Sequence, residues 1–303
     1  MKINSKAKSK LIRIVLTSGF IFWLSALGLF AQETTSEISK VVRKPVKGTF
    51  NGTVLIDNQS VMIPVIRSLE FSIQHRFGVI NNGYEDFYGI YAPANIRLGF
   101  NYVPINNIQA GFGFCKERML WDGNLKLVLL QQTENWSIPV SITYYGNFAA
   151  DTRKAENFVS KKDRYSYFHQ LLIACKIFEK LSVQISPSIS YLNNVEGCYN
   201  ADSTISPKMY NEHFAIAFSG KFSLTERIGL IANYDQPLTQ HTMNNPHPNI
   251  SFGLEYATSG HAFQLFLGNF QSIVPQYNNF NNQNDYLKNR YLIGFNVTRK
   301  FHL

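Results

Sequence analysis

Strict two-residue alternation of apolar and polar positions runs through most of this 303-residue chain. In the stretch "NIRLGFNYV", Ile96, Leu98, Phe100 and Tyr102 fall on one face, and polar residues and a glycine fall on the other. Successive side chains of a β-strand point to opposite faces, so this pattern predicts strands. After an apolar run near the N-terminus, no stretch reaches the roughly 20 apolar residues of a membrane-spanning helix. The sequence therefore predicts an all-β protein.

Twelve stretches carry the strand pattern, and many are close to the roughly 9–11 residues of a tilted membrane-spanning strand. They are residues 67–78, 94–103, 107–116, 122–131, 136–147, 164–178, 180–191, 210–222, 226–236, 249–257, 261–270 and 288–302. Short connections alternate with long ones along the chain. An even strand count with this alternation predicts a transmembrane antiparallel up-and-down β-barrel with short periplasmic turns and long external loops. A soluble β-sandwich, which also alternates, is the alternative.

Aromatic residues favour the membrane barrel, because the 24 Phe and 16 Tyr cluster at the predicted strand ends. Rings at strand ends are expected at the two membrane interfaces. The closing stretch "NRYLIGFNVTRKFHL" resembles the C-terminal sorting strand of Gram-negative outer-membrane barrels, although it ends in His302 and Leu303. The likeness implies outer-membrane lipid and the barrel-assembly machinery as partners.

The N-terminus is typical of a secretory signal peptide, which we expect at residues 1–31 with cleavage near Ala31. A basic region up to Arg13 precedes an apolar run from Ile14 to Phe30. An uncleaved anchor helix is the alternative, and no Cys lies near the junction to suggest a lipoprotein anchor. Residues 1–31 hold five basic and no acidic residues, so the rest of the chain has a net charge of only +4. This balance does not suggest a nucleic-acid partner.

The stretch between the signal peptide and the first predicted strand, residues 32–66, is harder to assign. It has strand character from Phe50 to Ile56. Counting it as a spanning strand would make thirteen strands, which is an odd number. We therefore expect a periplasmic or lumen-entering segment, followed by a barrel of residues 67–303. A paired extra strand remains the alternative.

Two stretches, "HRFG…NNGYEDFYGIYAPANIRLGFNY" and "DGNLKLVLLQQ", resemble a family of outer-membrane β-barrels classed as a domain of unknown function. The likeness spans roughly residues 45–303. It implies a barrel in the outer membrane of a Gram-negative organism. It implies no established activity and supplies no catalytic residues.

Motifs of catalysis are absent from the sequence, which has no P-loop, HExxH or GxSxG pattern. His241 and His247 share a predicted loop, but no third metal ligand follows at a readable spacing. Cys115, Cys175 and Cys198 are far apart and odd in number, which indicates unpaired packing residues. We expect no catalytic, cofactor or metal site. An outer-membrane lipid or peptide hydrolase, assembled from distant loops, is the enzymatic alternative.

The strand register places a set of polar and charged residues on the inner face, where they would line the lumen. The candidates are Glu70, Gln74, Arg76, Asn95, Arg97, Gln109, Lys126, Gln184, Lys221, Asp235 and Glu255. Some positions on the inner face are apolar instead. We interpret these side chains first as packing residues and second as the walls of a route for an apolar ligand. These positions are Val128, Leu130, Phe168, Leu172 and Ile231.

The function that this pattern favours is a passive, porin-like channel for small solutes, in which lumen charges bias the passage of ions. Glu85 and Asp86, in the first long loop, are candidate gate residues. The alternative is a structural or surface-interaction barrel with a plugged lumen. Barrels of about eight strands are filled by side chains, whereas barrels of about sixteen strands enclose an open channel. Twelve strands fall between these sizes, so the strand count does not decide between an open and a plugged lumen.

Overall fold

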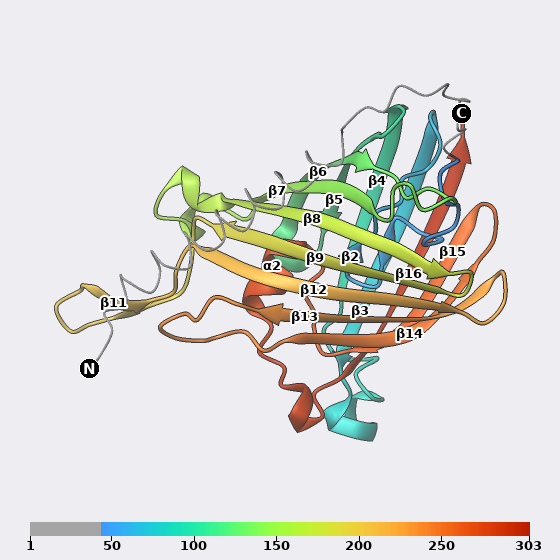
Figure 1. Ribbon diagram of the computed structural model, residues 1–303. Helices are drawn as coiled ribbons and strands as arrows, with labels where there is room; N and C mark the ends of the chain where they lie inside the picture. Colours follow the sequence, from blue (N-terminus) through green and yellow to red (C-terminus); the bar gives the residue numbers. More distant parts are fainter. Residues whose placement is uncertain (1–43) are drawn as a thin grey trace, which may run out of the picture. The chain divides into compact units, whose positions relative to one another are not determined.

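The computed structural model describes residues 44–303, so the predicted signal peptide lies outside the described residues. Twelve strands form a closed antiparallel barrel, in which each strand pairs with its neighbours in the chain and β16 pairs with β3 (Figure 1). The predicted twelve-stranded membrane barrel is confirmed. The strands are β3 (Ser68–Val79), β4 (Asn95–Ile105), β5 (Ile108–Cys115), β6 (Leu120–Leu130), β7 (Ser141–Asp151), β8 (Tyr165–Phe178), β9 (Leu181–Leu192), β12 (Glu212–Ser223), β13 (Ile228–Pro237), β14 (Asn249–Ala257), β15 (His261–Gly268) and β16 (Leu292–His302).

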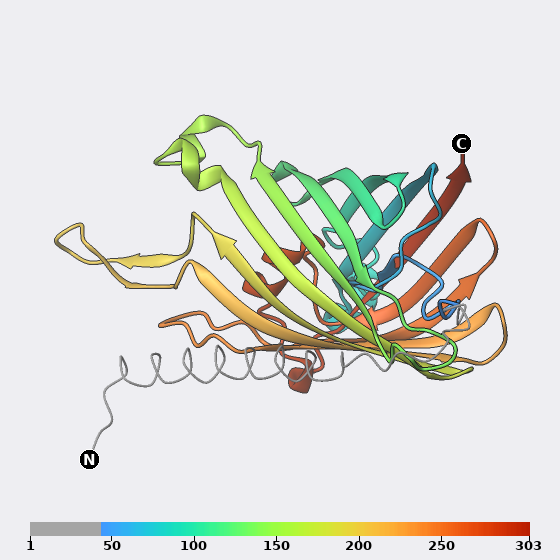
Figure 2. The same cartoon turned by 45° about the horizontal axis from the view of Figure 1, so that its top comes forward.

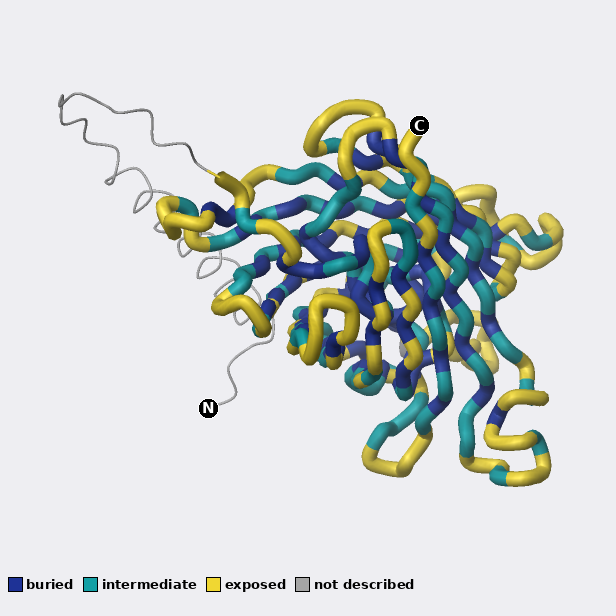
Figure 3. The backbone as a smooth tube through the Cα atoms, turned by 90° about the vertical axis from the view of Figure 1, so that its right-hand side faces the viewer, coloured by how far each residue is buried: buried dark blue, intermediate teal, exposed yellow. Residues whose placement is uncertain are grey.

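The alternation in the sequence becomes an alternation in burial along each strand of the wall. In β3, Glu70 and Arg76 on the inner face are fully buried, at 0% exposure. On the outer face, Phe112 of β5 and Leu265 of β15 are more than half exposed. Figure 3 shows this as buried residues alternating with less buried ones along the strands. The apolar side of the sheet therefore faces outward, as lipid requires.

The predicted bounds of β7 are wrong, because it runs from Ser141 to Asp151 and not over residues 136–147. Pro139 has no N–H for a strand ladder, and Trp136 has a left-handed φ of 58° in a turn. Residues 132–134 pair instead with the N-terminal segment, through the bridge between Pro45 and Thr133 and a 2.8 Å bond from Val46 N to Gln132 O. The predicted short connection between β6 and β7 is therefore longer than expected, and its first residues pair with a segment distant in the sequence. The start of β16 is also late, at Leu292 and not at residue 288.

Short elements lie between the wall strands. They are the hairpin β1 (Val54–Leu55) and β2 (Asn58–Gln59), the hairpin β10 (Gly197–Tyr199) and β11 (Ile205–Lys208), the helix α2 (Pro275–Asn281), and the 3-10 turns η1 (Ile80–Asp86), η2 (Glu117–Met119), η3 (Ala155–Asn157), η4 (Lys161–Arg164) and η5 (Tyr286–Lys288). The β10–β11 hairpin projects beyond the wall in Figure 2. No helix of the described part is long and apolar enough to cross a membrane.

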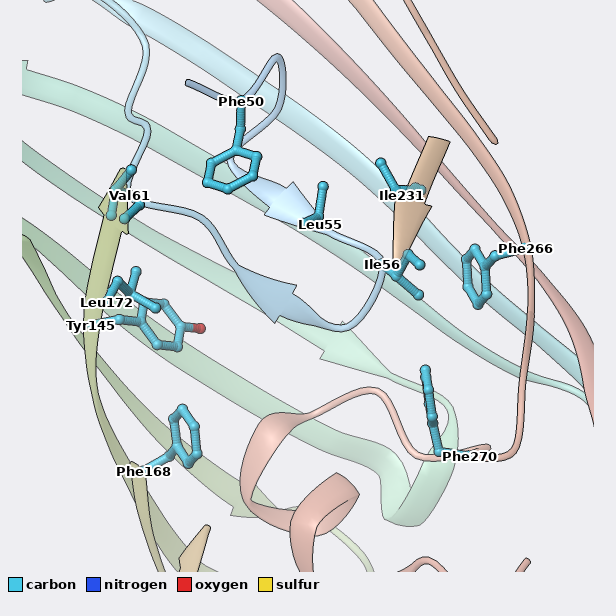
Figure 4. Close-up of a cluster of buried hydrophobic side chains, with 11 residues drawn as sticks. Phe50, Leu55, Ile56, Val61, Tyr145, Phe168, Leu172, Ile231, Phe266 and Phe270 are labelled. Carbon is cyan, nitrogen blue, oxygen red and sulfur yellow. The ribbon is translucent and has the colours of Figure 1, made fainter. Parts of the chain in front are cut away.

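The N-terminal part of the described chain, residues 44–66, runs inside the barrel and is here called the lumen segment. Phe50, Leu55 and Ile56 of this segment are almost completely buried against inward side chains of the wall (Figure 4). Their wall partners include Phe168, Leu172 and Ile231, which is the packing role first considered for these three inner apolar positions. The cluster does not include Val128 or Leu130, which flank an irregularity in the pairing of β6 with β7.

The connection between β15 and β16, residues 269–291, also enters the barrel and is here called the lumen loop. Its helix α2 begins at Pro275, whose fixed φ suits the first turn of a helix. Tyr277 and Phe280 of α2 are buried with Leu120 and Leu192 of the wall in a second apolar cluster. The lumen of the barrel is therefore filled from both ends.

Candidate functional site

The inner face of the wall is mostly polar. All eleven predicted lumen-lining residues lie on it. Each of them is at most 9% exposed. Such polar side chains need partners when water is excluded. Many of the partners are backbone groups of the lumen segment, so the contact between wall and segment is the candidate site.

Lys126 makes the densest of these contacts. Its ammonium donates to three carbonyl oxygens of the lumen segment, those of Thr53 at 2.9 Å, Ser60 at 3.1 Å and Met62 at 3.3 Å. Beside it, the Thr53 hydroxyl donates to Glu70 Oε1 at 2.6 Å. The hairpin is therefore fixed from its sides by a cation and a carboxylate of the wall.

The tip of the hairpin is held by three wall side chains at Ile56, which is fully buried. Its N–H donates to Gln264 Oε1 at 3.1 Å, and its carbonyl accepts from Arg76 Nη2 at 3.1 Å and Asn296 Nδ2 at 2.7 Å. Ile56 has a left-handed φ of 59°, which is costly for a β-branched residue. Strain of this kind, about 1–3 kcal/mol, persists only where the surroundings hold it in place.

The two residues after the tip connect the segment to both the wall and the lumen loop. Asp57 accepts from Asn233 Nδ2 at 2.7 Å and from Asn278 Nδ2 of α2 at 3.1 Å. Asn58 donates to Asp235 Oδ1 at 2.7 Å. The two lumen-filling segments therefore meet at Asp57.

Two ion pairs lie within the wall itself. Arg97 donates to both carboxylate oxygens of Asp122, at 2.8 and 2.7 Å, and the guanidinium has room because a Cβ on Gly113 would lie only 2.4 Å from Arg97 Nη2. Lys221 Nζ lies 3.1 Å from Glu255 Oε1. These four charges cancel in pairs, whether or not the lumen segment is present.

Side-chain amides hold the lumen loop. Gln276 donates to Asn147 Oδ1 and Ser166 Oγ, each at 3.1 Å. Asn279 donates to Ser188 and Ser190 of β9 at 3.3 and 3.4 Å. These are neutral contacts between side chains, in contrast to the cations that hold the lumen segment.

A polar cavity of about 480 Å³ lies at the long-loop end, lined by the lumen loop and by neighbouring loops. Glu117 is part of its lining, and burial raises the pKa of this carboxyl above its ordinary value. At the same end, the imidazole rings of His213 and His241 stack, with a ring nitrogen of each 2.9 Å apart. Phe280 of α2 packs against both rings, and burial lowers the pKa of His241.

The predicted gate residues lie elsewhere, on the exposed η1 loop. Asp86 accepts from Gly89 N at 2.8 Å and from Asn82 Nδ2 at 2.9 Å, which closes the loop on itself. Glu85 is exposed. Within residues 44–303, the hydrogen bonds of Asp86 stay inside its own loop, and no group of three or more His, Cys, Asp or Glu could hold a metal ion.

Prediction from the sequence did not identify the residues by which the lumen segment is held. Thr53, Ile56 and Asp57 carry no pattern of their own, and Gln264 was not among the candidates. The partners are far apart in the chain, as Lys126 is from Thr53 by 73 residues. The available signal was that apolar positions on the inner face coincide with two short apolar runs before the first strand, residues 54–56 and 61–65.

Comparison with known proteins identifies the class of the fold. The chain belongs to the family described as membrane bound beta barrel domain (DUF5777), whose model matches residues 50–301. This confirms the resemblance to a barrel family of unknown function. No curated protein matches the chain.

Solved structures with a similar fold include outer-membrane porins and channels. The NanC porin has a TM-score of 0.48 at 8% identity, covering 78% of this chain and 100% of that one. The KdgM porin has a TM-score of 0.45 at 9% identity, covering 78% of this chain and 99% of that one. The COG4313 outer-membrane channel from Pseudomonas putida F1 has a TM-score of 0.45 at 12% identity, covering 79% of this chain and 97% of that one. Likeness at this level carries no argument about solutes.

Proposed function

We propose that this protein is a gated channel for small solutes in a Gram-negative outer membrane, with a role in transport and not in catalysis. The lumen segment would be the gate, in its closed position. The observation that carries the proposal is that this segment fills the lumen but forms no part of the closed ring of wall strands. It runs into β3 at Arg67, and residues 44–46 hydrogen-bond to residues 132–134 between β6 and β7. It can therefore withdraw without opening any strand pair of the wall.

Two features of the gate support a reversible closure. Its contacts with the wall are hydrogen bonds and one apolar cluster, with no ion pair between the two in the described part of the chain. Its tip holds Ile56 in a strained conformation, which withdrawal would relax. Strained backbone of this kind is common in segments that switch between two states.

The location in the outer membrane is part of the proposal. The outward faces carry large apolar side chains such as Phe252, Leu254 and Leu265, each more than half exposed. Outer-membrane lipid would cover them, because an apolar band of this extent is costly in water. The barrel-assembly machinery would insert the chain, and the predicted signal peptide of residues 1–31 would direct its export.

Weakening the apolar contacts of the gate tests the proposal. Replacing Phe50, Leu55 and Ile56 together with Ala should cost about 2–5 kcal/mol of docking free energy for each side chain. In a planar bilayer, the triple variant should open far more often than the unchanged protein. Val159→Ala is the matched control, because this apolar side chain is 99% exposed. A folded triple variant that stays as silent as the control would contradict the gate.

A permanently plugged barrel that acts through its loops is the second candidate. It is favoured by exposed apolar residues outside the wall, where Tyr199 and Ile205 of the β10–β11 hairpin are 75% and 53% exposed. Tyr84 and Tyr91 of the first long loop are 82% and 80% exposed. Such a barrel would be silent in every variant and would lose a bound partner when the β10–β11 hairpin is replaced by a Gly-Ser turn.

A further inference from the structure

Four cations of the inner wall direct their charged groups at the backbone of the lumen segment. Besides the three bonds of Lys126, Arg76 donates to Ile56 O, Lys300 donates to Asn51 O at 2.9 Å, and Lys176 donates to Lys47 O at 3.1 Å. In the part of the chain that the structure describes, none of these four is in an ion pair. Backbone carbonyl oxygens thus take the place of negative partners.

The wall keeps a positive excess after its own pairs are removed. Arg97 with Asp122 and Lys221 with Glu255 cancel, and so does Asp151 at the end of β7 with Arg153 of the next loop. The remaining inward charges on the described wall strands are the four cations above against two carboxylates, Glu70 and Asp235. Withdrawal of the lumen segment would remove Asp57 together with Lys44 and Lys47. The open lumen would therefore carry two more positive charges than negative ones.

Lys126 shows what the wall would bind once the segment has left. An ammonium group has three donors, and all three carbonyl acceptors of Lys126 belong to the lumen segment. Withdrawal leaves the ammonium without these oxygens. Carboxylate and phosphate oxygens make shorter and stronger bonds to such a cation than carbonyl or water oxygens do.

We infer that Lys126, Lys300 and Arg76 form an anion-binding path, which the lumen segment occupies with its own carbonyl oxygens in the closed state. The transported solutes are then small anions that bear carboxylate or phosphate groups. This inference rests on the gated channel proposed above and adds its solute class. The lumen segment acts as a tethered substitute for the solute.

The test measures ion preference in a variant that lacks residues 44–66. Across a potassium chloride gradient in a planar bilayer, its reversal potential should show a preference for chloride. Adding Lys126→Gln and Lys300→Gln should lower the chloride-to-potassium permeability ratio about fivefold. Lys154→Gln, on an exposed loop, is the control and should leave the ratio unchanged. Inorganic phosphate should reduce the current of the open variant, and less so after the two Lys replacements.

The possible failures are distinct. An open variant that prefers potassium, or has no preference, overturns the anion path and leaves the gate intact. A silent variant that is folded, as shown by heat-modifiable gel mobility, overturns the gate and the anion path together. If the deletion does not fold, the Phe50, Leu55 and Ile56 triple Ala variant is measured in its place with the same two Lys replacements.

Discussion

The two segments that fill the lumen are held in opposite ways. The lumen segment, residues 44–66, presents backbone carbonyls to wall cations such as Lys126 and packs four buried apolar side chains into one cluster. The lumen loop, residues 269–291, presents side-chain amides to neutral groups of the wall and packs its rings among the neighbouring loops. In the described chain, the first runs into a wall strand only at β3 and is tied at residues 44–46 by hydrogen bonds to residues 132–134. The second runs into wall strands at both ends, β15 and β16.

This difference separates a part that can leave from a part that can only shift. A segment that runs into only one wall strand can withdraw as a unit once its hydrogen bonds and apolar contacts break. A loop joined at both ends stays within reach of the lumen and loses less conformational freedom when it docks again. Asp57 and Asn278 link the two parts by one hydrogen bond. The predictions below perturb each part and then the link.

The largest effect is expected from Lys126→Met. It removes three hydrogen bonds, those to the carbonyls of Thr53, Ser60 and Met62. Thr53 O keeps its bond from Ser60 N, and the loss should cost about 2–4 kcal/mol of docking free energy. Amides of residues 53–62 should then exchange much faster with deuterium, while those of α2 change little. Lys180→Met, at an exposed turn, is the control. Equal acceleration in both segments would show that they do not act separately.

A smaller effect is expected from Gln276→Leu in the lumen loop. Two neutral hydrogen bonds are lost, which should cost about 1–2 kcal/mol locally. Deuterium exchange should rise within α2 and stay unchanged in residues 53–62. Release of the lumen segment by this change would contradict the idea that only its own contacts hold it.

The link between the two parts should be worth less still. A double-mutant cycle of Asp57→Ala and Asn278→Ala should give a coupling free energy of about 1 kcal/mol. The measurement is the stability of residues 53–62 by exchange in the four proteins. Strict additivity would mean that the lumen loop does not brace the lumen segment.

The smallest effect concerns pH at the lumen loop. Burial holds the pKa of His241 below its ordinary value, so the packed loop favours the neutral ring. The stability from this packing is complete above the unfolded pKa, about 6.5, and declines as the pH falls through that value towards the lowered one. Acid should therefore loosen the contact of His241 with Phe280.

A fluorophore on the exposed Cys198, whose thiol lies 3.8 Å from the Met243 sulfur, can report this change. Its signal should shift between about pH 8 and pH 5 in a Cys175→Ser background. His241→Gln should flatten the profile. The same profile with and without His241 would assign the pH response to another group.

The wall could be predicted from the sequence because lipid on one side and a packed lumen on the other impose the two-residue period at every strand. Ten of the twelve predicted strands agree with the observed ones to within about two residues at each end, and the exceptions are β7 and the start of β16. Before β7, residues 132–134 pair with the lumen segment. The two-residue period shows which side chains share a face of a strand. It does not show where the strand begins or which distant segment pairs with the residues beside it.

The contents of the lumen could be predicted only in part. The inner positions of Glu70, Arg76 and Lys126 followed from register, but their partners did not. Lys300 and Asn51, for example, are separated by 249 residues. The hairpin β1–β2 has only two residues in each strand, which is too short for any period to appear.

The central claim is that the lumen segment closes an otherwise conducting barrel. The most direct test compares single-channel currents of the unchanged protein and of a variant without residues 44–66, both folded by heat-modifiable gel mobility and placed in the same planar bilayer. We predict rare, brief openings for the first and long-lived steps of uniform conductance for the second. A folded, inserted barrel that remains silent without residues 44–66 would contradict the claim.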